Sequence, residues 1–422
     1  MGRSAHTALD VFYGLERVGR VYDHSPLAFE YAPEWIASEH RLSLSLLPLQ
    51  AGLQSGPAVQ AVFENLLPEG ALRDYLTVKH QASTVFSLLR AVAGDTAGAF
   101  VLVPAGQRPE PPRYEVTDWT TLAARLSGPT AAAIELGAAR ARVSLAGAQD
   151  KASIALFEDG RPHLPKGSAP STHILKPNIR RLPTVWHSAA NEALVMRAAA
   201  LAGLPTAEVF YEPHTQACVV RRFDRGREAK GRITRRVQYD LCQLAGIVSE
   251  RKYEKEGGPG LADCAGLIRR YSTQAAADLR QLVRWVFFNL YVGNQDSHAK
   301  NLSLYSLPGQ GTLLTPFYDL MCTRLYPGLT AEFAFAIGGE RRPGALGPAH
   351  LVRMARELEM QPRFVAQQAQ EMAAQLPNAM QEAVEVIAPV LPASARTLAA
   401  RLERFVASNT QRLVKRLVAV ET

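Results

Sequence analysis

The sequence predicts an α+β protein in which a small α/β module precedes a β-rich segment and then a mainly helical segment. Period-2 alternation broken by glycine turns recurs before about residue 236, and helical periodicity dominates after residue 240. The Pro-rich polar stretch 106–113 is a candidate connector. We expect an N-terminal subdomain over 1–135 and a larger domain over 136–422, divided into 136–236 and 237–422.

The first module contains strand and helix patterns in turn. Residues 9–22 alternate around a turn at Gly14, and residues 41–48, RLSLSLLP, are a second strand candidate. Residues 56–78 have a helical pattern that Pro68, Glu69 and Gly70 interrupt. The module should therefore combine a small sheet with short helices.

The segment after Arg140 should form a second small sheet with one prominent helix. Residues 140–167 predict three strands, with a glycine-containing loop and a tight turn between them, and 172–177 predict a fourth. Residues 187–205 predict an amphipathic helix, closed by glycine and proline. Residues 207–225 predict a hairpin.

The last segment should be mostly helical. Residues 276–293 predict a strong, apolar helix with Gly293 near its C-cap. Residues 302–320 predict a hairpin with a Pro-Gly-Gln-Gly turn, and helices should follow from about His350 to the end.

Composition bounds the class of protein. The 422 residues are 47% apolar and 20% charged, ordinary for a globular chain with two or three domains. The net charge of +8 favours acidic partners such as nucleotides, phosphoproteins or nucleic acid without choosing among them. Four cysteines without metal-ligand spacing predict reduced core thiols. With no signal peptide and no apolar run long enough to span a bilayer, we expect a cytoplasmic protein without membrane contact.

The basic run 221–236 allows two interpretations. It contains eight Lys or Arg among sixteen residues, which is typical of a solvated hairpin. Contact with DNA or with a tRNA-bound substrate is the alternative. The sequence contains no helix-turn-helix pattern of its own.

A polar constellation follows the apolar helix pattern. The sequence contains no P-loop, dinucleotide-binding, nucleophile-elbow or zincin motif. Asp296 is instead followed five residues later by Asn301, and Asp319 comes after the predicted hairpin. Phosphoryl transfer uses one carboxylate to orient the attacking hydroxyl and oxygen ligands to hold Mg²⁺. The spacing therefore indicates a protein-kinase-like catalytic loop, although both residue types also serve as helix caps and turn formers.

The upstream sheet adds to this interpretation. Lys176 lies in a predicted strand, where a kinase places the lysine that contacts the α- and β-phosphates, and Glu192 on the next helix is its candidate partner. An edge-strand lysine and a solvated glutamate are the structural alternatives. The loop 144–151, SLAGAQDK, lies where a phosphate-covering loop would lie but has only one glycine. These features predict a two-lobe kinase-like fold with a small β-rich lobe and a larger helical lobe.

The same residues resemble a known family, the HipA-type serine/threonine kinase toxins of bacterial toxin–antitoxin pairs. The motifs that carry the resemblance are RVSLAGAQDKASIAL, PKGSAPSTHILKPN, RRFDR, KYEKEGGPG, GNQDSHAKN and PFYDL, in the order and spacing of the family. They span roughly Arg140 to Tyr326. One departure is Tyr239, where an acidic residue is expected before Asp240.

The resemblance implies a role for each matching residue. Asp296 would be the catalytic aspartate, Asn301 and Asp319 would hold Mg²⁺, and Glu192 would pair with the lysine. The residues that would contact ATP are Lys176, Ala146, Gly147, Ala148, Gln149, Lys151, Arg222, Phe223, His298 and Lys300. For His298 and Lys300, bracing of the loop and contact with phosphate both stay open. Arg222 and Phe223 would lie near the adenine side.

The resemblance also implies regulation and partners. Ser144 matches the serine whose autophosphorylation inactivates the family's kinases, and added negative charge beside a nucleotide site would repel ATP. The partners would be a HipB-like helix-turn-helix antitoxin, DNA through that antitoxin, and an aminoacyl-tRNA synthetase such as the glutamyl enzyme as the substrate whose phosphorylation arrests growth and causes persistence. A small-molecule phosphotransferase and a non-catalytic co-repressor are the competing hypotheses.

Overall fold

The computed structural model describes residues 8–39, 42–92, 94–127, 151–180, 182–228 and 231–418. The chain divides into two compact units that alternate along the sequence. Unit 1 comprises Met1–Leu175 and Arg222–Glu250, and unit 2 comprises Lys176–Arg221 and Arg251–Thr422. The expected boundary at 135/136 falls outside the described residues and stays a prediction.

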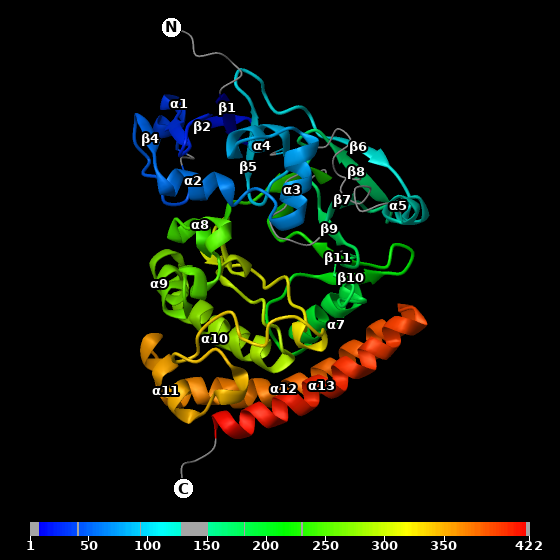
Figure 1. Cartoon of the computed structure of the whole chain (residues 1–422). Coiled ribbons are helices and arrows are strands. Elements are labelled where there is room, and N and C mark those ends of the chain that lie inside the picture. The colour runs from blue at the N-terminus through cyan, green and yellow to red at the C-terminus, as the bar shows by residue number, and fades with distance from the viewer. Residues whose placement is uncertain are drawn as a thin grey trace. The chain divides into compact units, whose positions relative to one another are not determined.

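Unit 1 begins with an antiparallel sheet of order β4-β3-β2-β1-β5 (Figure 1). Its strands are β1 (Ala8–Tyr13), β2 (Glu16–Tyr22), β3 (Ala28–Tyr31), β4 (Leu53–Ser55) and β5 (Phe100–Pro104). The helices of this region are α1 (Pro33–Ala37), α2 (Pro57–Glu64), α3 (Gly70–Lys79) and α4 (Val85–Val92). One apolar core joins them, built around large side chains such as Phe29, Trp35 and Phe63. The alternating segment with a turn at Gly14 and the interrupted helix pattern over 56–78 are both confirmed as a hairpin and as two helices.

The strand expected over 41–48 is wrong. Residues 42–48 form turns and irregular backbone, with φ of 53° at Ser45, a left-handed conformation incompatible with a strand. Leu44 and Leu47 are nevertheless buried, and the hydroxyl of Tyr31 bridges them by accepting from Leu44 N and donating to Leu47 O. The alternation of leucines therefore reflects insertion into the core and not pairing in a sheet.

The rest of unit 1 contains a second antiparallel sheet. Its pairing order is β9-β7-β8-β6, with β6 (Arg113–Val116), β7 (Ala152–Leu156), β8 (Pro162–Lys166) and β9 (His173–Lys176). Unit 1 also contains the helices α5 (Trp119–Leu126) and α8 (Leu241–Ala245) and the strands β12 (Arg225–Arg227), β13 (Ile233–Arg235) and β14 (Gln238–Asp240). The predicted strands of 151–177 are confirmed, while the first strand expected after Arg140 lies outside the described residues.

Unit 2 is mainly helical. Its helices are α7 (Ser188–Leu201), α9 (Leu261–Tyr271), α10 (Ala275–Val292), α11 (Pro348–Glu357), α12 (Pro362–Ile387) and α13 (Ala393–Leu417). Its hairpins are β10 (Val209–Glu212) with β11 (Ala217–Arg221) and β15 (Ser303–Leu307) with β16 (Gly311–Leu314). The long helices α12 and α13 lie side by side (Figure 1), and α10 packs against α9, α12 and α13. The helix over 276–293, both hairpins and the C-terminal helices are thus confirmed.

The amphipathic character predicted for α7 is wrong. Nearly all of its residues are buried, including the polar Ser188, Asn191 and Glu192. The helix packs against α12, α13, β10 and β11, so that little of its surface reaches solvent. Its polar side chains therefore need partners inside the unit.

Two further expectations concern the whole chain. Cys218, Cys242, Cys264 and Cys322 are all buried and none is part of a disulfide, as predicted for core thiols. Among the described helices, none has both the length and the apolar character that crossing a membrane would require.

Candidate active site

A buried lysine in unit 2 joins two acidic residues from distant parts of the sequence. Lys176, the last residue of β9, donates through Nζ to Glu192 Oε1 on α7 and, at 2.6 Å, to Asp319 Oδ1 beyond β16. The side chains of Lys176 and Glu192 are only 5% and 2% exposed, whereas Asp319 is 35% exposed. The edge-lysine and solvated-glutamate alternatives are therefore wrong for this pair.

The protonation state of Lys176 follows from its neighbours. Burial by itself would lower the pKa of this amine, but the charges and hydrogen bonds of Asp319 and Glu192 raise it above its ordinary value. Lys176 is thus a fixed cation at physiological pH. A fixed cation beside an exposed carboxylate suits a site for an anionic, metal-bound ligand.

Asn191 was missed by the sequence reasoning. Its Oδ1 accepts from Cys322 N at 2.9 Å, and its Nδ2 donates to Cys322 O at 3.0 Å and to the hydroxyl of Tyr326 at 2.9 Å. The residue beside Glu192 therefore ties α7 to the segment that follows Asp319. The only signal in the sequence was its position next to Glu192.

Asp319 has a backbone conformation that an aspartate rarely adopts. Its φ is 61°, in the left-handed region. Such a conformation costs free energy and persists only where the surroundings impose it. The contacts of Lys176 with its side chain and of Asn191 with Cys322 supply that constraint.

The loop that carries Asp296 begins at Gly293, a position that only glycine can occupy. Gly293 caps α10 with φ of 74°, and a Cβ there would lie 2.8 Å from Phe405 and 3.1 Å from Arg324. Its carbonyl accepts from Arg324 N at 3.1 Å and from the hydroxyl of Thr323 at 3.2 Å. Both the turn and the close approach therefore require glycine.

Buried amides then brace the loop from inside. Asn294 donates to Asn289 Oδ1 at 2.7 Å, while its own Oδ1 accepts from Asp296 N at 3.2 Å. Gln295 N donates to the hydroxyl of Thr323 at 2.8 Å. The side chains of Asn289, Asn294 and Thr323 thus brace the main chain of the loop, while the apolar helix provides a rigid mount.

The predicted metal ligands lie around this loop. The side chain of Asn301 is 5% exposed and donates through Nδ2 to Asp296 O at 3.3 Å, so that Oδ1 is the atom suited to binding a cation. Tyr318, next to Asp319, donates to Lys300 O, next to Asn301, at 3.0 Å. The structure thereby brings the neighbours of both predicted ligands into contact.

His298 and Lys300 are both buried within the loop, at 5% and 6% exposure. Burial, followed by the positive charge of Lys252, holds the pKa of His298 well below its usual range, so the ring is neutral at physiological pH. Its Nδ1 is buried without a hydrogen-bond partner among the described residues. An orphaned nitrogen of this kind is expected where a ligand or water completes the site.

The remaining residues predicted to bind ATP come from other parts of the sequence. Ser144, Ala146, Gly147, Ala148 and Gln149 are outside the described residues, so their roles stay predictions. Lys151 directly precedes β7 in unit 1, and Arg222 and Phe223, which come directly after β11 in the sequence, also belong to unit 1.

The side chain of Arg222 makes its contacts inside unit 1. Its guanidinium is 2% exposed and donates to the carboxylates of Asp95 and Asp224, the hydroxyl of Ser171 and the carbonyl of Thr96. These contacts account for all five of its N–H groups. Arg225 and Arg235 also pair with Asp95. The solvated-hairpin interpretation of 221–236 therefore fails for Arg222 and Arg225 but describes Arg232, which is exposed and pairs with Glu228.

Tyr239, the departure from the family pattern, is partly buried and packs against the core of unit 1. Its hydroxyl donates to Ser43 O at 3.1 Å, and its ring stacks on Phe100. These contacts give the tyrosine a packing role there.

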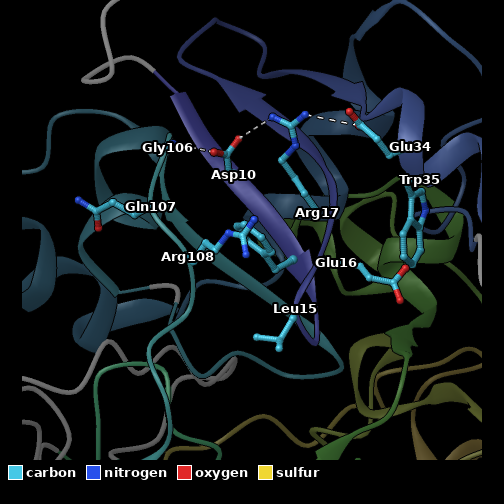
Figure 2. Close-up of a pocket in the computed structure, with 10 residues that line it drawn as sticks. Asp10, Leu15, Glu16, Arg17, Glu34, Trp35, Gly106, Gln107 and Arg108 are labelled. Atoms are coloured by element: carbon cyan, nitrogen blue, oxygen red, sulfur yellow. Dashed lines mark hydrogen bonds and ion pairs between the residues drawn. The ribbon is translucent and has the colours of Figure 1, made fainter.

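A cavity of about 470 Å³ in unit 1 lies apart from the predicted kinase residues in the sequence. Figure 2 shows Arg17 between Asp10 and Glu34, at 4.0 and 3.6 Å, with Gly106 N donating to Asp10 at 2.7 Å. Asp10 is 2% exposed and also pairs with Arg20. Three of the charged residues that line this cavity, Asp10, Arg17 and Glu34, therefore compensate one another in part.

The lysine–glutamate pair, the loop that carries Asp296 and the second aspartate after a hairpin agree with the layout of a kinase-like phosphotransferase. Residues 143–381 match the family model of the HipA-like C-terminal domain, and residues 9–103 match that of the HipA N-terminal domain. The chain belongs to the HipA family of serine/threonine-protein kinase toxins, and the predicted α+β, kinase-like fold is confirmed.

Individual relatives agree with this assignment. A putative kinase of Sinorhizobium fredii, Y4mE, is 39% identical over 75% of this chain and 76% of its own length. The serine/threonine-protein kinase toxin HipA of Shewanella oneidensis is 30% identical over 86% of this chain and 85% of its own. A chain in the structure of the S. oneidensis HipA, HipB and operator DNA complex superposes with a TM-score of 0.82 and 26% identity, covering 98% of this chain and 100% of that chain. The protein is therefore a protein kinase, which disfavours the small-molecule and non-catalytic hypotheses.

Proposed function

We propose that this kinase transfers the γ-phosphoryl group of Mg²⁺-ATP to a serine or threonine hydroxyl of a protein, with Asp296 as the catalytic residue. The observation that carries the proposal is the placement of Lys176, Glu192, Asp296, Asn301 and Asp319 within one compact unit. A kinase requires a nucleotide, and usually a divalent metal.

The side chains present fit such a group. Magnesium prefers oxygen ligands and is held by one or two carboxylates together with phosphates, a set that Asp319 and Asn301 Oδ1 supply. When bound, the metal would neutralise the phosphate charge, while Lys176 and the orphaned His298 Nδ1 would face the phosphates.

The chain's own residues would position the reactants. Asp296 is exposed at the surface of an otherwise buried loop, so a protein hydroxyl can reach its carboxylate. A carboxylate with an ordinary pKa of about 3.9 is a weak base. Its contribution is therefore to orient the hydroxyl and to stabilise charge, with Glu192 holding Lys176 in place.

The test uses the full-length chain and labelled ATP. Asp296→Ala should reduce phosphate incorporation to background, with an unchanged melting temperature, and chelation of Mg²⁺ should have the same effect on the parent chain. Phosphate incorporation by Asp296→Ala at the parent rate would refute the assignment.

The proposals about regulation and cellular partners rest on the family resemblance. Ser144 is proposed as the inactivating autophosphorylation site, which intact-mass analysis and peptide mapping would locate, with Ser144→Ala as the control. Label on another residue in the parent chain, with Ser144 unmodified, would contradict this assignment.

The proposed cellular partners are a HipB-like antitoxin, DNA through that antitoxin, and an aminoacyl-tRNA synthetase of the glutamyl type as substrate. The S. oneidensis HipA structure contains HipB and operator DNA, which supports the first two. A new phosphoserine on a synthetase after brief expression in the cytoplasm, absent with Asp296→Ala, would support the third. If another protein alone is phosphorylated, that protein and not the synthetase is the substrate.

A further inference from the structure

The motif KYEKEGGPG, residues 252–260, has no role in the kinase chemistry described so far. In the structure its tyrosine, Tyr253, donates a hydrogen bond from its hydroxyl to Asp296 Oδ1. The tyrosine ring also packs edge-on against His298, with the ring centroids 5.0 Å apart at 87°. Tyr253 therefore contacts two residues of the catalytic loop from a segment more than forty positions earlier in the chain.

The glycines of the motif fix the backbone of this tyrosine. Tyr253 O accepts from the amides of Glu256 and Gly258, both at 2.9 Å. Gly257 has φ of 85°, and a Cβ at Gly258 would lie 2.2 Å from Arg251 O. A side chain at Gly258 would thus force the turn open and move the phenol.

Glu254 anchors the same turn from the other side. Its Oε2 accepts from Ala336 N at 2.6 Å and pairs with Arg341 at 3.2 Å. Both partners belong to the segment after Asp319. The two consecutive residues, Tyr253 and Glu254, therefore connect the catalytic loop with that segment through one rigid turn.

The chemistry of a carboxylate indicates what the phenol does. An aspartate turns about χ2 over a broad range, because that torsion has only a shallow two-fold preference. A donor on one oxygen limits this rotation, and a carboxylate has lone pairs enough to accept another hydroxyl as well. A phenol is also a donor that stays protonated at neutral pH.

We propose that Tyr253 is a positioning residue, which holds the Asp296 carboxylate in the orientation that receives the substrate hydroxyl. The inference rests on the proposed catalytic role of Asp296. It predicts a loss in the rate of transfer without a loss in nucleotide binding, because the phenol acts on the aspartate and not on ATP.

Tyr253→Phe removes the hydroxyl and keeps the ring against His298. With the full chain and labelled ATP, the maximal rate of self-phosphorylation should fall about 10- to 100-fold. The ATP concentration for half-maximal rate and the melting temperature should stay unchanged. Tyr291→Phe is the matched control: its phenol donates to Ala369 O at 3.1 Å in the core of unit 2, so it should lower the melting temperature and keep the rate.

A second pair of variants tests the turn while keeping the phenol. Gly258→Ala should lower the maximal rate as Tyr253→Phe does. Gly266→Ala, where a Cβ would meet nothing within 4 Å, should leave the rate unchanged. An unchanged rate in both Tyr253→Phe and Gly258→Ala would overturn the inference.

The remaining outcomes separate this inference from the proposed function. A faster Tyr253→Phe would mean that the phenol obstructs the acceptor site, and a parallel loss of stability and ATP binding would mean a merely structural role. If Asp296→Asn is inactive, either result overturns the positioning role of Tyr253 and leaves the proposed role of Asp296 in place. If Asp296→Asn keeps its activity, the proposed role of Asp296 fails first and the inference with it.

Discussion

Asn191 and Cys322 hold each other in both directions, because the side-chain amide of Asn191 accepts from Cys322 N and donates to Cys322 O. Both residues are fully buried. Cys322 lies three residues after Asp319, and Asn191 is next to the Glu192 that pairs with Lys176. The two hydrogen bonds therefore fix the main chain near Asp319 to the helix that carries Glu192. Geometry at the proposed metal ligand thus depends on an amide that touches no substrate.

Replacement of Asn191 by leucine should therefore damage both stability and catalysis. The buried N–H and C=O of Cys322 would lose their partners, at a cost of about 2–4 kcal/mol in the free energy of unfolding. The rate of phosphoryl transfer by the folded protein should fall at least about tenfold, because the main chain that follows Asp319 is no longer held by Asn191. Denaturant titration and single-turnover labelling measure the two effects.

Asn409 offers a matched control for that variant. It is a buried amide on α13 that donates to Tyr291 O at 2.8 Å. Asn409→Leu should lose comparable stability while its folded fraction keeps the parent rate. Equal losses of rate in the two variants would show that Asn191 acts through general stability alone.

Lys176→Met should unfold the site as well as inactivate it. Glu192 is 2% exposed and would lose the cation that neutralises its buried charge, which costs about 3–5 kcal/mol. The double variant Lys176→Met/Glu192→Leu should regain much of this stability yet stay inactive, because the cation that faces the phosphates is missing. Thermal unfolding and labelled-ATP assays distinguish the two effects, and an active double variant would contradict the role of Lys176.

Arg222→Ala tests the structural role of the RRFDR motif. Removal of this guanidinium leaves Asp95 and Asp224 short of a buried partner, which should cost unit 1 about 3–5 kcal/mol. The ATP affinity of the folded protein should not change, because all five donors are used inside unit 1. Arg232→Ala, which breaks an exposed pair, should cost at most about 1 kcal/mol. Weaker ATP binding by Arg222→Ala at unchanged stability would instead support a nucleotide contact.

The same ion network predicts a dependence of stability on acid. Burial opposes ionisation of Asp224, but the charges of Arg222 and Arg225 prevail and lower its pKa to about 2. A carboxyl group whose pKa is depressed on folding stabilises the folded state above its unfolded pKa of about 3.9, and this contribution disappears as the pH falls through the folded value.

Urea unfolding of the parent chain and of Asp224→Asn can measure this contribution. The parent should be more stable at pH 7, and the difference should shrink by about 2 kcal/mol as the pH falls from 4 to 2. A difference that stays constant over this window would show that Asp224 does not titrate with the network.

Much of the fold followed from local patterns. The helix over 276–293, the hairpin over 302–320 and the interrupted helix over 56–78 were predictable because periodicity, glycine caps and turn residues act within a few positions. The pairing of Lys176 with Glu192 was also anticipated, since the order of strand and helix suggested it.

Other features were not readable in this way. The leucines of 41–48 suggested a strand because alternation has the same appearance whether the residues pair in a sheet or enter a core as irregular chain. Residues 187–205 suggested an amphipathic helix because the sequence does not reveal how many neighbours a helix has. The family resemblance assigned Arg222 to the nucleotide, and its contact with Asp95 could not be foreseen because Asp95 lies 127 positions earlier.

The sequence by itself determined the family, the elements and the residues suited to phosphoryl transfer, because residue type and spacing along the chain carry that information. Only the tertiary structure decided which groups hold them: Asn191 against Cys322, Tyr253 against Asp296 and Asp95 against Arg222. These contacts join positions far apart in the sequence, and each depends on distance and direction in space. No local pattern encodes a donor that meets its acceptor only after the chain has folded.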